Sequence, residues 1–255
     1  MTVAHRVTGR PGAPAVVLSN SLGSTWEMWD ANLAELEQHF RVIRFDTRGH
    51  GRSPVPPGPY TIDDLTDDVV ELLDTLELER AHFVGLSLGG MTGLRLAARE
   101  AGRVDRLVVL CTGARLDPRS AWSERAALVR SEGTPAVAEA VVRRWYTADW
   151  LAEHPRTRKE SEEMVASTPP DGYAACCEVI ATMDLLADLP SITAPTLAIA
   201  GADDPATPPW QLERIADEVA DGKLLVVPDA AHLANAERPA VVTPAVVAHL
   251  LEDGS

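Results

Sequence analysis

The sequence predicts an α/β protein with a mostly parallel, doubly wound sheet interrupted by a helical cap. Three observations predict it. Short apolar runs alternate with amphipathic stretches through residues 1–115, the alternation stops in 116–189, and it resumes in 190–255. Near-continuous apolar strands separated by helices are typical of parallel sheets that are covered on both faces. We therefore expect one core domain, made of the two outer segments, with a cap inserted between them.

The elements of the first core segment follow from apolar spacing and capping. In residues 61–78 the apolar side chains step by three and four, so that one face of a helix is buried. Thr61 can cap this helix, with Asp64 at the third position, where a capping box has its acid. The other elements expected here are strands at 15–19, 41–45, 82–86 and 107–111 and a helix at 88–101.

The inserted stretch has helical spacing and no run that is typical of a strand. It carries Trp122, Trp145 and Trp150, and a strong breaker at 168–172. A cap in this place would lie over the carboxyl ends of the strands, where such sheets bind ligands. Beyond it we expect strands at 196–200 and 224–227, a helix at 210–219 and a last helix at 241–251 that Pro244 starts or kinks.

Composition limits the class of partner. The 255 residues carry a formal charge of −15, so neither nucleic acid nor an anionic membrane is expected as a partner. No apolar run approaches the roughly 18 residues of a membrane helix, and the start lacks the apolar stretch of a signal peptide. The three cysteines, Cys111, Cys176 and Cys177, suit a reducing compartment. We expect a cytoplasmic globular protein that is a monomer or a small homo-oligomer.

The most informative motif is Gly85-Leu86-Ser87-Leu88-Gly89, which matches G-x-S-x-G. An apolar strand ends on the serine and a helix begins there, so the serine lies in a tight strand-to-helix turn. Such a turn exposes the hydroxyl, and the N-terminus of the following helix favours negative charge beside it. We interpret Ser87 as a nucleophile rather than as a simple helix cap.

A serine hydroxyl needs a base to remove its proton and an acidic group to orient that base. In proteins with this elbow, the order along the chain is serine, acid, histidine. His232 satisfies that order, whereas His50 precedes the serine. The other five histidines fall at a terminus, at polar or helical surface positions, or at the start of a strand. Asp203 and Asp204 follow the strand expected at 196–200 and compete for the role of the acid.

Acyl transfer places negative charge on a carbonyl oxygen, so preorganised N–H donors are expected beside the nucleophile. The following residue, Leu88, supplies one backbone N–H. The second is expected from the loop after the strand at 15–19, with Leu22 as the donor. Asn20 in this loop is interpreted as a brace, and the segment 46–53 as a glycine-braced turn that holds neighbouring loops together.

These motifs resemble the α/β-hydrolase fold. More narrowly, the chain is similar to the 3-oxoadipate enol-lactonases of bacterial aromatic catabolism. The resemblance selects Asp204 as the acid, because in relatives it usually lies three residues after the loop glycine. Many relatives have His-Gly where this chain has Asn20-Ser21, a change that leaves the backbone donors in place. The matching segments span residues 19–239 and read SNSLGSTWEMWD, DTRGHGRSPVPPGPYTIDDL, GLSLGGM, RRWYT, STPPDGYAACCEVI, AGADDPATPP and AAHLANAERP.

The resemblance implies 3-oxoadipate enol-lactone as substrate, a five-membered unsaturated lactone with a carboxymethyl group. Ser87 would attack the ring carbonyl while His232 takes its proton, and the product would be 3-oxoadipate. A protein of charge −15 repels this anionic substrate, so a local cation is expected in the cap or at the pocket rim, together with an apolar wall. The candidates for the cation are Arg144 first, then Arg143 and Arg130, and those for the wall are Trp145 and Trp26.

Other functions remain open on the same residues. A carboxylesterase or a cofactor-free perhydrolase would use the same triad, and a hydrolase-like ligand receptor would have lost catalysis. No cofactor is expected. A metal site is not expected either, because the histidines lack HExxH spacing and Cys176-Cys177 has no partner pair at ligand spacing.

Overall fold

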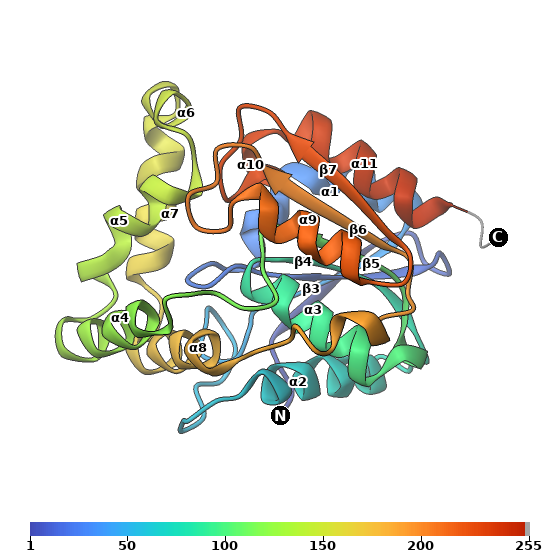
Figure 1. Ribbon diagram of the computed structural model, residues 1–255, viewed down its shortest axis with the longest axis horizontal. Coiled ribbons are helices and arrows are strands. Elements are labelled where there is room, and N and C mark those ends of the chain that lie inside the picture. Colours follow the sequence, from blue (N-terminus) through green and yellow to red (C-terminus); the bar gives the residue numbers. More distant parts are fainter. Residues whose placement is uncertain (253–255) are drawn as a thin grey trace.

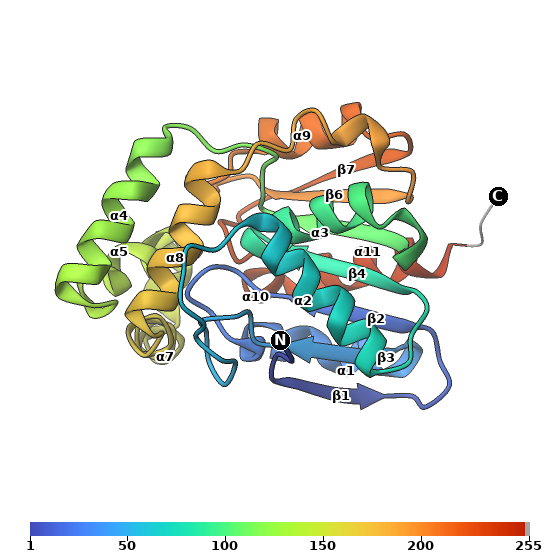
Figure 2. The same cartoon turned by 90° about the horizontal axis from the view of Figure 1, so that it is seen from below.

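The computed structural model describes residues 1–252, and these residues form a seven-stranded sheet in the order β1-β3-β2-β4-β5-β6-β7. β1 (His5–Gly9) runs antiparallel to β3 (Arg41–Phe45), and the other neighbouring strands are parallel. Figure 2 shows the strands in this order across the molecule. The expected mostly parallel sheet is confirmed. Its remaining strands are β2 (Ala15–Ser19), β4 (Ala81–Leu86), β5 (Val104–Leu110), β6 (Thr196–Gly201) and β7 (Gly222–Val227).

Helices cover both faces of the sheet, as expected for a doubly wound fold (Figure 1). α2, α3 and α9 lie on one face, and α1 and α11 pack together on the other. This burial on both faces explains why the central strands read as continuous apolar runs. The helices of the core are α1 (Asp30–His39), α2 (Ile62–Thr75), α3 (Leu88–Arg99), α9 (Pro209–Glu218), α10 (Ala234–Glu237) and α11 (Pro239–Leu251), with short 3-10 turns at Trp26–Trp29, Ala101–Arg103 and Leu189–Ser191.

The capping box expected at the start of α2 is confirmed. The Asp64 N–H donates to Thr61 Oγ1 at 3.2 Å, and the Thr61 N–H donates to the Asp64 carboxylate at 2.8 Å. The helix then buries Leu65, Val69 and Leu72. Its first turn is therefore fixed by local chemistry and its face by packing against α3.

Five helices lie between β5 and β6 and gather beyond one end of the sheet, on the left of Figure 1. α4 packs against α8, and α5 packs against α7. That residues 116–189 form a separate cap domain stays a prediction. The helices are α4 (Arg119–Glu132), α5 (Pro135–Trp145), α6 (Ala148–Glu153), α7 (Pro155–Ala166) and α8 (Pro170–Thr182).

The apolar spacing did not indicate β1, α1 or the short helix α10. β1 is an edge strand whose residues are all exposed or half-buried, and α1 buries only Asn32 and Leu36, so neither carries a clear apolar pattern. At the C-terminal helix, the expectation that Pro244 starts α11 is wrong. The helix starts at Pro239, whose missing N–H is tolerated at the first helical position, and Pro244 lies inside it.

The cysteines are free and buried in the described residues. Burial raises the pKa of the Cys177 thiol to about 12, so it stays protonated and packs as a small apolar group. Within residues 1–252, no helix combines the length and the hydrophobicity that crossing a membrane requires.

Candidate active site

Ser87 is the single residue between the end of β4 and the start of α3. Its φ of 57° and ψ of −114° are strained for a residue with a side chain. A Cβ at Gly85 would lie 2.2 Å from the Gly89 carbonyl oxygen, and one at Gly89 would lie 2.4 Å from that of Ser19. Both positions therefore require glycine for the turn to close. Thr112 Oγ1 donates to the Ser87 carbonyl oxygen at 2.7 Å and helps to hold the strained conformation.

His232 and Asp204 meet at the same edge of the sheet. Nδ1 of the imidazole lies 2.7 Å from Oδ2 of the carboxylate, with the two residues 5% and 3% exposed. The N–H groups of Ala206 and Thr207 donate to Oδ1, and Thr207 Oγ1 donates to Oδ2. Burial raises the pKa of Asp204, but the imidazole and these donors outweigh it and hold the pKa below its ordinary value. The ionised carboxylate accepts the Nδ1 proton, which leaves Nε2 as a base.

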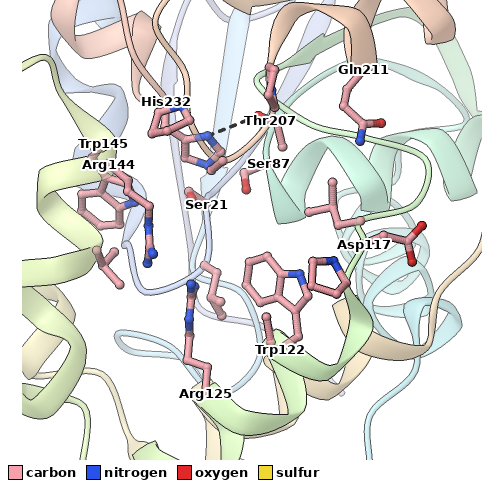
Figure 3. A pocket seen from close by; sticks show the side chains of 18 of the residues that line it. Ser21, Ser87, Asp117, Trp122, Arg125, Arg144, Trp145, Thr207, Gln211 and His232 are labelled. Carbon is pink, nitrogen blue, oxygen red and sulfur yellow. Dashed lines mark hydrogen bonds between the residues drawn. The ribbon is translucent and has the colours of Figure 1, made fainter.

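The structure separates the two competing aspartates. Asp203 is exposed, and its backbone N–H donates to the Ala230 carbonyl oxygen, whereas Asp204 contacts the imidazole. Ser87 and His232 both line one cavity (Figure 3). Within the described residues, no hydrogen bond joins Ser87 Oγ to the imidazole. Such bonds commonly tighten only when a substrate is bound.

The two predicted oxyanion donors have free N–H groups. Leu22 and Leu88 are 5% and 1% exposed, and neither backbone N–H donates to an acceptor within residues 1–252. Buried N–H groups without an acceptor are rare, so these two are available to a ligand. Leu22 also lines the cavity. Asn20 braces this loop as expected, because its amide donates to the Phe45 carbonyl oxygen at 2.7 Å and accepts from Trp29 Nε1 at 3.0 Å.

His50 stabilises the same loop through a hydrogen bond with Gly23. Its ring is buried, Nε2 accepts the Gly23 N–H at 3.0 Å, and Nδ1 donates to the Arg48 carbonyl oxygen at 3.2 Å. Burial lowers the pKa of His50, so the ring stays neutral and keeps its acceptor. Because Gly23 follows Leu22, this hydrogen bond helps to fix the direction of the predicted oxyanion donor.

We expect the free energy of unfolding to fall as the pH drops below about 6.5, the ordinary pKa of histidine. Burial lowers the pKa of His50, His82 and His249 in the folded protein. In this pH range the unfolded chain therefore binds more protons than the folded protein, and stability decreases as the pH decreases. Urea unfolding at about pH 7.5 and about pH 5.5 measures the effect. His50→Gln should reduce the difference between the two free energies of unfolding. An unchanged difference would show that His50 does not contribute to this pH dependence.

The surface position expected for His249 is wrong, since this residue is 4% exposed and contacts the Pro195 carbonyl oxygen.

Of the three arginines expected near the substrate, only Arg144 reaches the cavity. Arg143 pairs with Glu139 at 2.6 Å and Arg130 with Glu178 at 2.5 Å, both on exposed helix faces. The expected order, with Arg144 first, therefore agrees with the placement of the side chains.

The two tryptophans proposed for the wall differ in position. Trp145 is buried and lines the cavity (Figure 3). The structure does not bring Trp26 into the cavity wall. Its ring lies 4.3 Å from the guanidinium of Arg52, and its backbone N–H donates to Asp46 at 2.9 Å, so it belongs to the turn at 46–53.

Two cavity residues, Trp122 and Arg125, were not singled out as substrate contacts from the sequence. Both lie on α4, one helical turn apart, and the guanidinium lies 4.5 Å from the indole ring. Figure 3 shows the guanidinium of Arg125 pointing toward that of Arg144 on α5. The available signal was the i, i+3 spacing of an aromatic and a cation in the cap, which resembles any solvated helix face.

The loop with the predicted histidine is tied to the start of α6 by a buried carboxylate. Glu237 accepts the Ala231 N–H at 2.8 Å, and it also accepts the backbone N–H of Thr147 at 3.1 Å and its hydroxyl at 2.5 Å. On the other side of the histidine, the Leu233 N–H donates to the Trp145 carbonyl oxygen at 2.8 Å. Glu237 was missed because a single acidic residue at the end of the short helix α10 carries no local signature.

The cavity has a volume of about 350 Å³, in the range of small-molecule sites. It lies between the elbow, the histidine loop and the helices α4 and α5 (Figure 3). A nucleophile candidate, a base held by an ionised acid, and free N–H donors thus surround one space. This arrangement is able to carry out acyl transfer.

Known proteins are similar to this chain in sequence and in fold. The family described as alpha/beta hydrolase fold matches residues 14–239. 3-Oxoadipate enol-lactonase 2 of Acinetobacter baylyi is 38% identical over 94% of this chain and 90% of its own length. RutD of Stutzerimonas stutzeri, named as a candidate carbamate hydrolase, is 32% identical over 95% of this chain and 93% of its own. The crystal structure of the enol-lactonase from Burkholderia xenovorans LB400 has a TM-score of 0.96 and 43% identity, covering 98% of this chain and 96% of that one.

The similarity to enol-lactonases that the motifs indicated is confirmed, and so is the expectation of an ester-hydrolysing enzyme. The family match covers most of the chain, and the strand order and helical layers agree with it. The chain belongs to the α/β-hydrolase fold family.

Proposed function

We propose that this protein opens the ring of 3-oxoadipate enol-lactone by a Ser-His-Asp acyl-enzyme mechanism. The observation that carries the proposal is the 2.7 Å contact between His232 Nδ1 and Asp204 Oδ2, directly behind the cavity that Ser87 lines. The similarity to enol-lactonases supports the substrate class. A cytoplasmic location and a place in the β-ketoadipate pathway of aromatic catabolism are part of the same proposal.

In the first half of the reaction, Ser87 Oγ attacks the lactone carbonyl carbon while His232 Nε2 takes its proton. Asp204 stabilises the imidazolium, and the N–H groups of Leu22 and Leu88 hold the oxyanion. The tetrahedral intermediate collapses with cleavage of the ring C–O bond. The leaving oxygen is enolate-like and is therefore easier to expel than an alkoxide.

The leaving group of a lactone stays attached to the acyl chain, so it remains beside the acyl-enzyme. After it takes a proton, the enol tautomerises to a ketone, which no longer attacks the ester and cannot close the ring. His232 then activates a water molecule that hydrolyses the Ser87 ester and releases 3-oxoadipate. Each proton moves between substrate, water and imidazole, so these steps require no cofactor or metal.

The same residues support other acyl transfers, and a substrate panel distinguishes them. We compare kcat/KM for the enol-lactone, an uncharged aryl ester, a small carbamate, and a carboxylic acid with hydrogen peroxide. The enol-lactone should exceed the others by about 100-fold or more. A carbamate preference would instead follow the similarity to RutD, and an ester or peroxide preference would indicate a carboxylesterase or a perhydrolase. Absence of turnover together with no labelling of Ser87 by a serine-directed reagent would favour the ligand receptor.

A further inference from the structure

We infer that Arg125, Arg144 and the hydroxyl of Tyr173 form a carboxylate-binding site in the cavity, which selects lactones and esters that carry a free carboxylate and also takes short dicarboxylates. The kind of substrate that is hydrolysed rests on the proposed function above. Binding of a carboxylate does not depend on that function, so carboxylate binding and hydrolysis are testable separately.

The first observation is a pair of cations without a counterion. Arg125 on α4 and Arg144 on α5 both line the cavity and point toward one another (Figure 3), and within residues 1–252 neither guanidinium forms an ion pair with a carboxylate. The cap otherwise pairs its arginines with acidic side chains. The other five arginines of α4–α8 all do so, namely Arg119, Arg130, Arg143, Arg156 and Arg158.

The second observation is that the surroundings favour an added negative charge. Burial and repulsion by Arg125 lower the pKa of Arg144, which means that the charged form is destabilised where it stands. Among the described residues that line the cavity, Asp117 is the single acidic side chain, and it pairs with Arg115 at 2.9 Å. An anion between the two guanidiniums would remove the repulsion and supply the missing acceptor.

The third observation is an unsatisfied donor. The Tyr173 hydroxyl is completely buried, the residue lines the cavity, and the oxygen has no hydrogen-bond partner within residues 1–252. Burial raises the pKa of Tyr173, and the positive charges of Arg125 and Arg144 offset part of that effect. The phenol thus stays protonated and able to donate. Leaving a buried hydroxyl without a hydrogen bond is unfavourable, and a carboxylate ligand would accept a hydrogen bond from it.

The remaining wall suits a short carbon chain between two polar ends. Trp122 lies 4.5 Å from the Arg125 guanidinium and Trp145 is buried beside Arg144, so the cavity wall next to the two cations is apolar. Guanidinium groups hold carboxylates through two parallel N–H donors, which orients as well as binds them. A substrate held in this way would present its other end to Ser87.

The kinetic test compares Arg125→Met and Arg144→Met with Arg143→Met, the same change on α5 at an arginine outside the cavity. The first two should raise KM for the enol-lactone about 10-fold to 100-fold with little change in kcat, and leave KM for an uncharged aryl ester unchanged. Arg143→Met should behave as wild type toward both substrates. Tyr173→Phe should give a smaller increase, about fivefold. Equal increases for the charged and the uncharged substrate would overturn the proposal.

The binding test does not depend on turnover. Titration of adipate into Ser87→Ala should show saturable binding that weakens with salt, and dimethyl adipate should not compete for it. Adding Arg125→Met and Arg144→Met to Ser87→Ala should abolish the binding, while adding Arg143→Met should preserve it. Thermal unfolding is the control for folding, and both single cavity variants should melt at or above the wild-type temperature because a like-charge repulsion is removed.

The outcomes separate the two proposals. If wild type does not open the enol-lactone but adipate binding requires Arg125 and Arg144, the carboxylate site stands and the proposed reaction fails. If the lactone is opened but adipate binds equally well to the triple variant, the reaction stands and the carboxylate site is overturned.

Discussion

Replacing Ser87 by alanine should lower kcat for enol-lactone opening by about 10⁵-fold or more and leave the fold intact. The hydroxyl is the only group of this residue that the mechanism uses. The contacts that hold its strained backbone come from the main chain, since Ser87 donates its N–H to Leu110 and accepts from Thr112 through its carbonyl oxygen. Alanine keeps both contacts. Loss of the enol-lactone chromophore measures activity, and thermal unfolding measures the fold.

Ser21→Ala is the matched control for this experiment, because Ser21 lines the same cavity but has no role in the proposed mechanism. We expect its kcat to stay within about tenfold of wild type. If Ser87→Ala also keeps activity within that range, Ser87 is not the nucleophile and the acyl-enzyme mechanism fails.

Asp204→Asn should lower kcat by about 10⁴-fold, the size that the same change has in a serine protease triad. The backbone N–H groups of Ala206 and Thr207 donate to Oδ1, so the amide oxygen of asparagine should take that position. Its NH₂ group then replaces Oδ2 and faces His232 Nδ1. The imidazole would be held with its proton on Nε2, where it cannot accept the proton of the nucleophile.

Asp203→Asn is the matched control, because the neighbouring carboxylate is exposed and does not contact the imidazole. Its activity should be that of wild type. Equal losses in the two variants would contradict the assignment of Asp204.

A stability measurement tests the same residue independently of catalysis. The pKa of Asp204 is lower in the folded protein than in the unfolded chain, so the ionised carboxylate adds stability above the unfolded pKa, about 3.9. That contribution is lost as the pH falls through the folded pKa. Asp204→Asn should therefore be less stable than wild type at neutral pH, and urea unfolding should show the difference shrinking below about pH 4.

The strands of the sheet were predictable where they are buried on both faces. The strands expected at 15–19 and 41–45 agree with β2 and β3, because their apolar residues are buried between the two helical layers. β1 lies at the edge of the sheet, and its residues are exposed or half-buried, so it does not require apolar side chains. Its pairing with β3 comes from backbone hydrogen bonds, which any sequence can supply.

The proposed reacting groups were predictable because each follows a strand. Ser87, Asp204 and His232 lie in loops after β4, β6 and β7, and the carboxyl ends of parallel strands meet at one edge. The motif and the chain order therefore predict these residues from the sequence alone. From the residues alone, Asp203 and Asp204 were equally plausible as the acid, and the resemblance to relatives favoured Asp204. The structure distinguishes them, because Asp204 is buried and contacts the imidazole.

What the sequence determined by itself is the layered sheet, the elbow and the chain order of the three proposed reacting groups, because local patterns encode strands, caps and tight turns. Only the tertiary structure decided which cap residues line the cavity. Arg125 and Arg130 both look like solvated helix positions, yet packing turns the first toward Arg144 in the cavity and the second toward Glu178 outside it. The direction of a helix face depends on how that helix packs against its neighbours, and no local signal carries that information.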